Sequence, residues 1–227
     1  MIRNLLGDIQ DRPVQESSTP HGAIAIVADV SSSMEGEKID SLNTAINNMN
    51  EQLRCDARLR NIIDIAIFAF GEKNREPVVQ GFQAVGDCGQ VTLNANDGST
   101  YVCDTLNTTI DRLMQRVDLY NQGGGAWKPW VILITDGEFH DSDYSLDEAA
   151  TRIQQLEKEG KLHFFGLGVD GFRRNQLEKF AVDKKRVIGV KTANFGEFFS
   201  WVGRSMVTIS HTEVGEAVTL EPLVFTI

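Results

Sequence analysis

Short apolar runs alternate along the chain with longer segments in which apolar residues recur every three or four positions. The runs have the length and the small flanking residues of strands that are buried on both faces. They are GAIAIVADV (22–30), IIDIAIFAF (62–70), WVILITD (130–136), KLHFFGLGV (161–169) and RVIGV (186–190). Residues 76–93 contain glycines between shorter apolar groups, which predicts short edge strands.

The segments between these runs carry apolar stripes with helical spacing. The stripes are Ile39, Leu42, Ile46, Met49 and Leu53; Leu106, Ile110, Leu113 and Val117; Ala149, Ile153 and Leu156 within 144–160; and Phe195, Phe198, Val202 and Met206. A shorter helix is expected over 173–182. Strands that alternate with helices are joined by right-handed crossovers and run parallel, so the pattern predicts a doubly wound α/β (Rossmann-like) sheet with helices on both faces.

The chain divides into a single domain and two flanking segments. Residues 1–21 are expected to form a leader over the surface, because 7–21 are polar and contain two prolines. The domain is expected to span residues 22–207. Residues 208–227 are expected to form a tail that packs back on it.

Charge and composition exclude several classes of partner. The 22 lysines and arginines stand against 32 acids, a net charge of −10, which disfavours nucleic acid and anionic membranes. No apolar run approaches the ~20 residues of a membrane span, and acidic residues interrupt the N-terminus where a secretory signal would be apolar. A cytoplasmic location is expected. Cys55, Cys88 and Cys103 lack disulfide or zinc-site spacing and are expected to be buried, reduced thiols.

Candidate chemistry follows two of the predicted strands. Asp29, Ser31 and Ser33 form a D-x-S-x-S motif after the first run, and Asp136 precedes a glycine after WVILIT. Thr100 comes just before the second long helix. Ligands bind beyond the carboxyl ends of parallel strands, so these side chains are expected to meet at one edge of the sheet.

Two carboxylates and three hydroxyls form an all-oxygen set, which suits Mg²⁺ or Mn²⁺ and lacks the nitrogen and sulfur ligands typical of zinc. Neutral hydroxyls leave the ion electrophilic, so water or an outside carboxylate must complete its coordination. The alternative is that D-x-S-x-S is only a helix cap and turn. The downstream Thr100 and the T-D-G sequence favour the metal site.

These motifs, in this order, resemble a von Willebrand factor A (VWA) domain with a metal-ion-dependent adhesion site (MIDAS). The resemblance covers roughly residues 22–207, and VADVSSSMEGEKIDSLNTAI and KPWVILITDGE are similar to bacterial TerY/YegL-type proteins of tellurium-resistance and stress operons. It implies a six-stranded sheet with one antiparallel edge strand and metal-dependent protein binding without catalysis. It also implies that Ser31, Ser33 and Thr100 ligate the ion directly, while Asp29 and Asp136 bind it directly or through water.

The chain departs from the family pattern at two positions. Ser32 stands where a glycine is more common, and Gly98 and Ser99 precede Thr100 in place of two glycines. Ser99 is therefore an alternative third hydroxyl ligand. The partner is expected to supply an Asp or Glu to the metal, and the resemblance suggests a protein kinase or a PP2C-type phosphatase encoded nearby.

Other features have two interpretations each. A metal-dependent hydrolase with Asp29 as its nucleophile is the alternative function, but Ser31 occupies the place of the second aspartate that a haloacid-dehalogenase-type phosphatase needs. Glu138, His140, Asp141 and Asp143 form either a solvated loop or a second cation site. The basic stretch 173–186 is either a solvated face or a docking patch. Trp127 and Trp130 are expected to serve packing.

Overall fold

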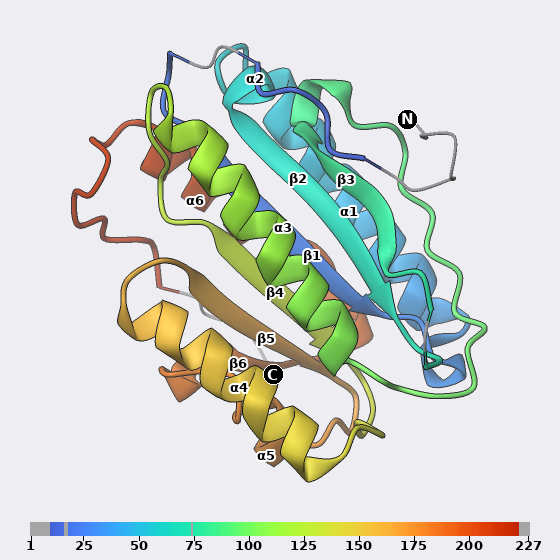
Figure 1. Ribbon diagram of the computed structural model, residues 1–227. Helices are drawn as coiled ribbons and strands as arrows, with labels where there is room; N and C mark the ends of the chain where they lie inside the picture. Colours follow the sequence, from blue (N-terminus) through green and yellow to red (C-terminus); the bar gives the residue numbers. More distant parts are fainter. Residues whose placement is uncertain (1–9, 16–17, 74, 223–227) are drawn as a thin grey trace.

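A computed structural model describes residues 10–15, 18–73 and 75–222 of the chain. Within these residues one six-stranded sheet has the order β3-β2-β1-β4-β5-β6 (Figure 1). Neighbouring strands are parallel except β2 and β3, which are antiparallel. The strands are β1 (Gly22–Asp29), β2 (Ile63–Phe70), β3 (Val78–Ala84), β4 (Trp130–Thr135), β5 (His163–Val169) and β6 (Val187–Val190). The predicted doubly wound sheet with one antiparallel edge strand is confirmed.

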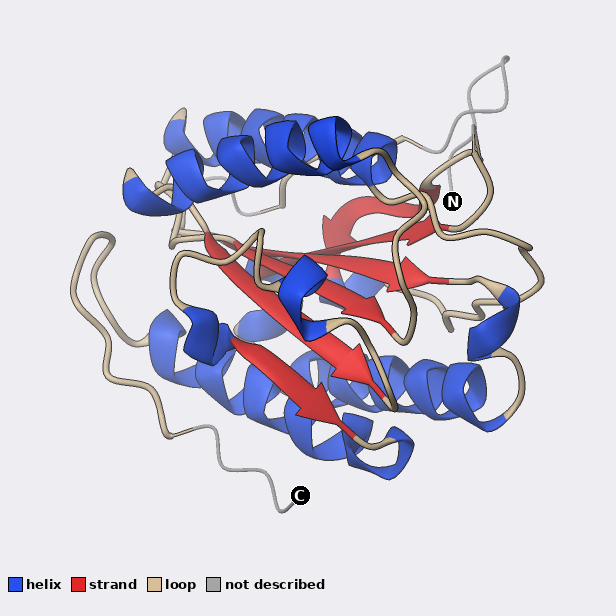
Figure 2. Ribbon diagram, turned by 90° about the horizontal axis from the view of Figure 1, so that it is seen from below, coloured by secondary structure: helices blue, strands red, loops and turns tan. Residues whose placement is uncertain are grey.

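Helices cover both faces of the sheet (Figure 2). The long helices are α1 (Glu37–Cys55) and α6 (Phe195–Ser210) on one face, and α3 (Cys103–Asn121) and α4 (Asp143–Lys158) on the other. The short ones are α2 (Leu59–Ile62), α5 (Arg174–Leu177) and the 3-10 turns η1 (Ser32–Met34), η2 (Val85–Asp87), η3 (Lys184–Arg186) and η4 (Thr192–Asn194). The described chain is thus a three-layer sandwich.

The two helix layers bury opposite faces of β1. Ile24 and Ile26 lie in the core shared with α1 and α6, whereas Ala25 and Val27 lie in the core shared with α3 and α4. All eight residues of β1 are buried, which explains why its apolar run is continuous instead of alternating. Asp29, the last residue of this strand, is consequently held in a fixed position.

The segment after β2 differs from the expectation of several short edge strands over 76–93. Only β3 joins the sheet, and the following residues cross the molecule outside the ladder. Asn47 on α1 donates to Val91 O and accepts from Val91 N, both at 2.8 Å. Asn43 pairs with Leu93 in the same way, at 2.9 and 2.8 Å. Side chains of a helix therefore satisfy the backbone groups that a neighbouring strand would otherwise bind.

The helix expected over 173–182 is also shorter than predicted. It is confined to α5, because side chains of α4 bind the backbone groups that follow it. Gln154 donates to Lys179 O at 2.6 Å, and Glu157 accepts from Val182 N at 2.8 Å. The four-residue helix α2 was not predicted, because a single turn carries no periodic signal.

Both flanking segments contact the body of the molecule. Arg12 N donates to Phe82 O at 2.8 Å, and Asp11 accepts from Phe82 N at 2.7 Å, so this part of the leader lies along β3. In the tail, the carbonyl oxygen of Thr212 accepts from the Trp127 indole at 3.1 Å. Residues 1–9 and 16–17 of the predicted leader and 223–227 of the tail lie outside the described residues. No helix in the described part of the chain is long and apolar enough to cross a membrane.

The three cysteines are free thiols with different environments. Cys88 and Cys103 are buried as expected, but Cys55 is exposed, so the prediction was wrong there. Cys55 is the last residue of α1 and lies off its buried stripe, which consists of residues such as Met49 and Leu53. Burial raises the pKa of the Cys88 thiol to about 11, which keeps it protonated at neutral pH.

Candidate metal centre

The carboxyl ends of β1 and β4 bring the two predicted aspartates to one edge of the sheet. The strands are adjacent and parallel, with Ala28 opposite Ile134. Asp29 ends β1, and Asp136 follows β4 directly. Both are buried, with Asp29 fully inaccessible and Asp136 7% exposed. Two carboxylates are therefore held close together where water has little access.

The serines of the D-x-S-x-S motif connect to the second aspartate. The hydroxyl oxygens of Ser31 and Ser33 lie 3.0 Å apart. The Ser33 hydroxyl donates to Asp136 Oδ1 at 2.7 Å. Three of the five predicted ligands are therefore linked by hydrogen bonds, which join the loop after β1 to the residue after β4.

Asp29 is oriented by its own loop and by β4. Its Oδ1 accepts from Ser31 N at 2.9 Å, and its Oδ2 accepts from the Thr135 hydroxyl at 2.6 Å. Burial raises the pKa of Asp29 to about 6 against these hydrogen bonds, and the negative charge of Asp136 adds to the increase. A buried carboxylate with this environment is stabilised by a nearby positive charge.

Thr100 reaches the same edge from the loop that precedes α3. Its backbone N donates to His140 Nδ1 at 2.9 Å and its carbonyl accepts from His140 N at 2.9 Å, which fixes this loop to the loop after β4. A Cβ placed on Gly137 would lie 3.8 Å from Thr100 Oγ1 and 4.0 Å from Asp29 Oδ2. The hydroxyl of Thr100 and the carboxylate of Asp29 thus border the same space. Ser99 makes no hydrogen bond to the other candidate ligands in the described chain.

Lys38 is the first of three residues that sequence reasoning missed. Its ammonium donates to Asp136 Oδ2 and, at 3.1 Å, to the carbonyl oxygen of Ser33. The side chain comes from the first turn of α1 and is 25% exposed. Its positive charge offsets part of the charge of the carboxylate pair. The sequence signal that could have revealed it is a lysine in the helix that follows the D-x-S-x-S motif.

The second missed residue, Thr135, links Asp29 to the loop after β4. Its hydroxyl accepts from Gly137 N at 3.1 Å while donating to Asp29. It lies directly before Asp136 in the T-D-G sequence, so its position was visible although its role was not. Thr135 fixes the orientation of Asp29 relative to Asp136.

Asp97, the third missed residue, ties together the two hydroxyl-bearing loops. Its carbonyl oxygen accepts from Ser32 N at 2.6 Å, and its carboxylate accepts from Arg75 Nη1 at 2.6 Å and from Glu72 N at 3.2 Å. A Cβ on Gly71 would lie 2.2 Å from Asp97 Oδ2, so only glycine permits this close approach. The loop of Ser31 and the loop of Thr100 are consequently held in register.

The acidic loop after T-D-G makes separate contacts instead of one cluster. Asp141 accepts from Val102 N at 2.7 Å and from Cys103 N at 3.2 Å, which caps the start of α3. Glu138 pairs with Arg173 at 3.3 Å, and Asp143 pairs with Lys179 at 3.6 Å. In the described chain no group of three or more His, Cys, Asp or Glu side chains could hold a metal ion.

The candidate ligands fit a hard cation in their chemistry. Asp29 and Asp136 supply two negative charges, Lys38 supplies one positive charge, and the remaining donors are neutral hydroxyls. Mg²⁺ and Mn²⁺ prefer oxygen ligands of this type. The residues are also preorganised, because each carboxylate is held by hydrogen bonds from neighbouring loops.

Known folds resemble this one despite low sequence identity. The vWF domain of the type V pili tip protein Mfa5 from Porphyromonas gingivalis matches with a TM-score of 0.63 and 12% identity, over 86% of this chain and 98% of that chain. Proximal thread matrix protein 1 from the mussel byssus matches with a TM-score of 0.59 and 19% identity, over 85% of this chain. The match spans 47% of the mussel protein, about half its length. Another structure of the mussel protein has a zinc-occupied MIDAS motif.

Sequence comparison identifies the family. A search of curated protein sequences found no match. The family profile of the von Willebrand factor type A domain, however, matches residues 22–181, which is more than half of the chain. This range contains the whole candidate centre, from Asp29 to Asp136. The chain therefore belongs to the von Willebrand factor type A domain family.

Proposed function

We propose that this domain captures a partner protein through a divalent cation held by Asp29, Ser31, Ser33, Thr100 and Asp136. The observation that carries the proposal is the hydrogen bond from Ser33 to Asp136, together with the 3.0 Å contact between Ser31 and Ser33. It joins a loop after β1 to a loop after β4, as a shared ligand set requires. VWA domains are typically interaction modules that depend on such a site.

The chain's own residues set the chemistry of capture. Asp29 and Asp136 attract the cation, and their hydrogen bonds from Thr135 and Ser33 keep them in place. The hydroxyls contribute no charge, so a bound Mg²⁺ or Mn²⁺ would retain affinity for an Asp or Glu of the partner. A protein of net charge −10 would then attract an acidic group at this edge.

The contacts of Asp29 argue against the alternative of a hydrolase. A carboxylate nucleophile must approach its substrate, but Asp29 is fully buried and both of its oxygens accept hydrogen bonds. VWA domains are usually not catalytic. Binding is the function that this geometry supports.

The cellular setting that we propose is a bacterial stress, phosphorylation-linked or defence system. It rests on the similarity of the sequences around Asp29 and Asp136 to TerY/YegL-type proteins. A protein kinase or a PP2C-type phosphatase encoded nearby is the partner to test first.

We propose Mg²⁺ or Mn²⁺ as the ion, and Zn²⁺ belongs in the same assay because the MIDAS motif of the mussel protein is occupied by zinc in one structure.

The test is capture of the candidate partner by the purified domain in Mg²⁺ and in EDTA. We expect capture only with the metal, and none by Asp29→Asn. Asp143→Asn is the matched control, because Asp143 has a side chain that is 94% exposed and lies outside the ligand set. Equal capture in Mg²⁺ and EDTA would contradict a metal bridge and favour the basic stretch 173–186 as the docking surface.

A further inference from the structure

One lysine lies within the candidate metal centre. The ammonium of Lys38 donates to Asp136 Oδ2 and, at 3.1 Å, to the carbonyl oxygen of Ser33. The Asp136 side chain is 1% exposed and that of Lys38 is 25% exposed, so the lysine is the solvent-facing member of the pair. Among the described residues it is the only Lys or Arg that forms an ion pair with one of the five candidate ligands.

The backbone of α1 limits where this lysine can reach. Gly36 enters the helix with a φ of 78°, a left-handed conformation that favours glycine. Its carbonyl oxygen accepts from Asp40 N at 3.1 Å, which closes the first turn around residue 38. Met34 before this turn and Ile39 within it are buried in the core. Because the backbone is held on both sides, the ammonium can change partners only by rotation of its own side chain.

Lys38 decides the sign of the charge at the centre. Asp29 and Asp136 carry two negative charges, which a bound Mg²⁺ or Mn²⁺ cancels, and the hydroxyl ligands carry none. With Lys38 included, the loaded centre therefore carries one excess positive charge. Without the lysine the loaded centre would be neutral, and it would attract a carboxylate less strongly than the charged one.

The other charged groups near the centre are either paired or exposed. Asp97 pairs with Arg75 at 2.6 Å, so their charges offset each other. Glu138 pairs with an arginine of the neighbouring loop at 3.3 Å. Glu35 and Glu37 flank the turn into α1, but both are exposed, so water and salt screen them. Lys38 is consequently the charge that adjoins the ligands themselves.

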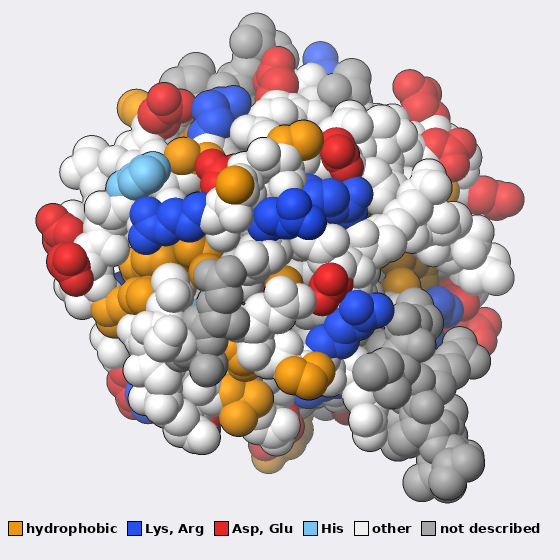
Figure 3. All heavy atoms as spheres, turned by 90° about the horizontal axis from the view of Figure 1, so that it is seen from above, with side chains coloured by type: hydrophobic (Ala, Val, Ile, Leu, Met, Phe, Trp, Pro, Cys, Tyr) orange, Lys and Arg blue, Asp and Glu red, His pale blue; other side chains and the backbone are white. Residues whose placement is uncertain are grey.

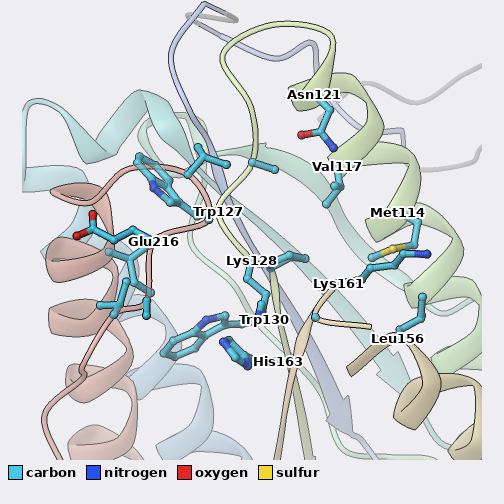
Figure 4. Close-up of a pocket in the computed structure, with 18 of the residues that line it drawn as sticks. Met114, Val117, Asn121, Trp127, Lys128, Trp130, Leu156, Lys161, His163 and Glu216 are labelled. Carbon is cyan, nitrogen blue, oxygen red and sulfur yellow. The ribbon is translucent and has the colours of Figure 1, made fainter. Parts of the chain in front are cut away.

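The opposite end of the molecule has basic residues without a comparable arrangement. Lys and Arg side chains lie there next to apolar ones on the surface (Figure 3). A pocket of about 900 Å³ opens beside the start of β4 and β5, and Lys128 and Lys161 line it (Figure 4). None of the five candidate ligands lines this pocket. Lys128 is exposed and lies at the other end of β4 from Asp136, which makes it a matched control for the loss of a lysine.

We propose that Lys38 binds the carboxylate that the loaded centre captures, and that it is a specificity-determining residue of this edge. In the free domain its ammonium neutralises Asp136, and a divalent cation that takes over this carboxylate releases the ammonium for the captured group. A carboxylate has two oxygens, so one can bind the cation while the other accepts from the ammonium. The inference rests on the proposed function and selects a carboxylate over a neutral amide, which carries no charge for the ammonium to pair with.

Acetate is the probe, and Mn²⁺ is bound by an excess of the whole chain at constant ionic strength. Acetate that displaces water from the ion lowers the relaxation rate of the bulk water protons, which gives the affinity for acetate without a partner protein. We expect a saturable decrease with acetate and none with acetamide at the same concentrations.

Substitutions of the lysine separate its effect from that of the metal. Lys38→Met is expected to bind Mn²⁺ no more weakly than the wild type in calorimetry, but to bind acetate about tenfold more weakly. Lys38→Arg should bind acetate to within about threefold of the wild type, because a guanidinium also donates to carboxylates. Lys128→Met should leave both affinities unchanged.

The outcomes distinguish this inference from the proposed function. Equal acetate affinities in the wild type and Lys38→Met would overturn the role of Lys38 and leave the metal bridge intact. A loss of Mn²⁺ binding in Lys38→Met would also overturn that role, because the lysine would then position Asp136 for the ion. A wild type whose relaxation rate acetate does not change would have no position on the ion open to a carboxylate, and would contradict the proposed function itself.

Discussion

The ammonium of Lys38 and the hydroxyl of Ser33 bind different oxygens of the Asp136 carboxylate. Asp136 Oδ1 accepts from Ser33 and Oδ2 accepts from Lys38. A side chain from α1 and a loop after β4 therefore form an ion pair within the candidate metal centre. We therefore expect Lys38 to compete with a cation for this carboxylate.

Lys38→Met is expected to raise the affinity for Mn²⁺ by about three- to tenfold, because it removes a positive charge in contact with a ligand. Calorimetric titration with Mn²⁺ measures the change. Lys185→Met, which removes an exposed lysine, is the matched control. A loss of affinity in Lys38→Met would show that the lysine positions Asp136 for the ion instead of competing with it.

The double substitution Ser31→Ala and Ser33→Ala is expected to abolish Mn²⁺ binding and leave the domain folded. Ser33 is exposed and Ser31 lies beyond the end of β1, so neither contributes apolar surface to the two cores. Calorimetry and far-UV circular dichroism measure the two effects. Thr44→Ala, on the exposed side of α1, controls for the loss of a hydroxyl. Loss of the circular dichroism signal would mean that the serines hold the fold.

Thr135→Val is expected to lower the free energy of unfolding in EDTA by about 1–3 kcal/mol, because it leaves the buried Asp29 without one hydrogen bond. The shapes of the two side chains are similar, so packing changes little. Urea denaturation measures the loss, with Thr44→Val as the exposed control. An unchanged midpoint would show that water replaces the hydroxyl.

His163→Gln is expected to reduce the sensitivity of the fold to acid. The pKa of His163 is about 4 in the folded protein and 6.5 without the fold, so unfolding takes up a proton between these values. The stabilisation is fully present above pH 6.5 and is lost as the pH falls toward 4. Between pH 7 and pH 4.5 the wild type should lose about 2–3 kcal/mol more than the variant, measured by urea denaturation. Parallel losses would contradict this assignment.

Mg²⁺ is expected to stabilise the domain without being required for folding. Both cores consist of apolar side chains from the sheet and helices, and their burial drives folding. At a Mg²⁺ concentration of about 100 times Kd the linkage contributes about 2.7 kcal/mol. Thermal melts in Mg²⁺ and EDTA should show a higher Tm with the metal and a cooperative transition in both. Unfolding by EDTA would make the site structural.

The sequence pattern predicted the strands and helices that pack directly against an apolar core. The continuous apolar run corresponds to β1, which is buried on both faces, and the stripe from Ile39 to Leu53 corresponds to α1, which is buried on one. The crossing segment 88–95 could not be predicted, since its backbone partners are Asn43 and Asn47 on a distant helix.

The candidate site likewise contains residues that the sequence predicted and residues that it did not. The five predicted ligands belong to motifs that are read locally, at the ends of two strands and before a helix. Lys38, Thr135 and Asp97 act through contacts with residues far away in the chain, such as the pair of Lys38 with Asp136. Their roles depend on which loops become neighbours in the folded molecule, which residue types and spacing do not specify.

The leader residues that lie along β3 have a consequence for the behaviour of the protein at high concentration. β3 is an outer strand of the sheet, and such strands can pair with the same strand of another molecule. The backbone N of Arg12 and the carboxylate of Asp11 bind the outward-facing backbone of Phe82. Gln10 lies so close to Gly81 that a side chain at position 81 would clash with it. The leader thereby covers the edge of β3 to which a strand of another molecule could add. At the other edge of the sheet, β6 has only four residues and offers little backbone for such pairing.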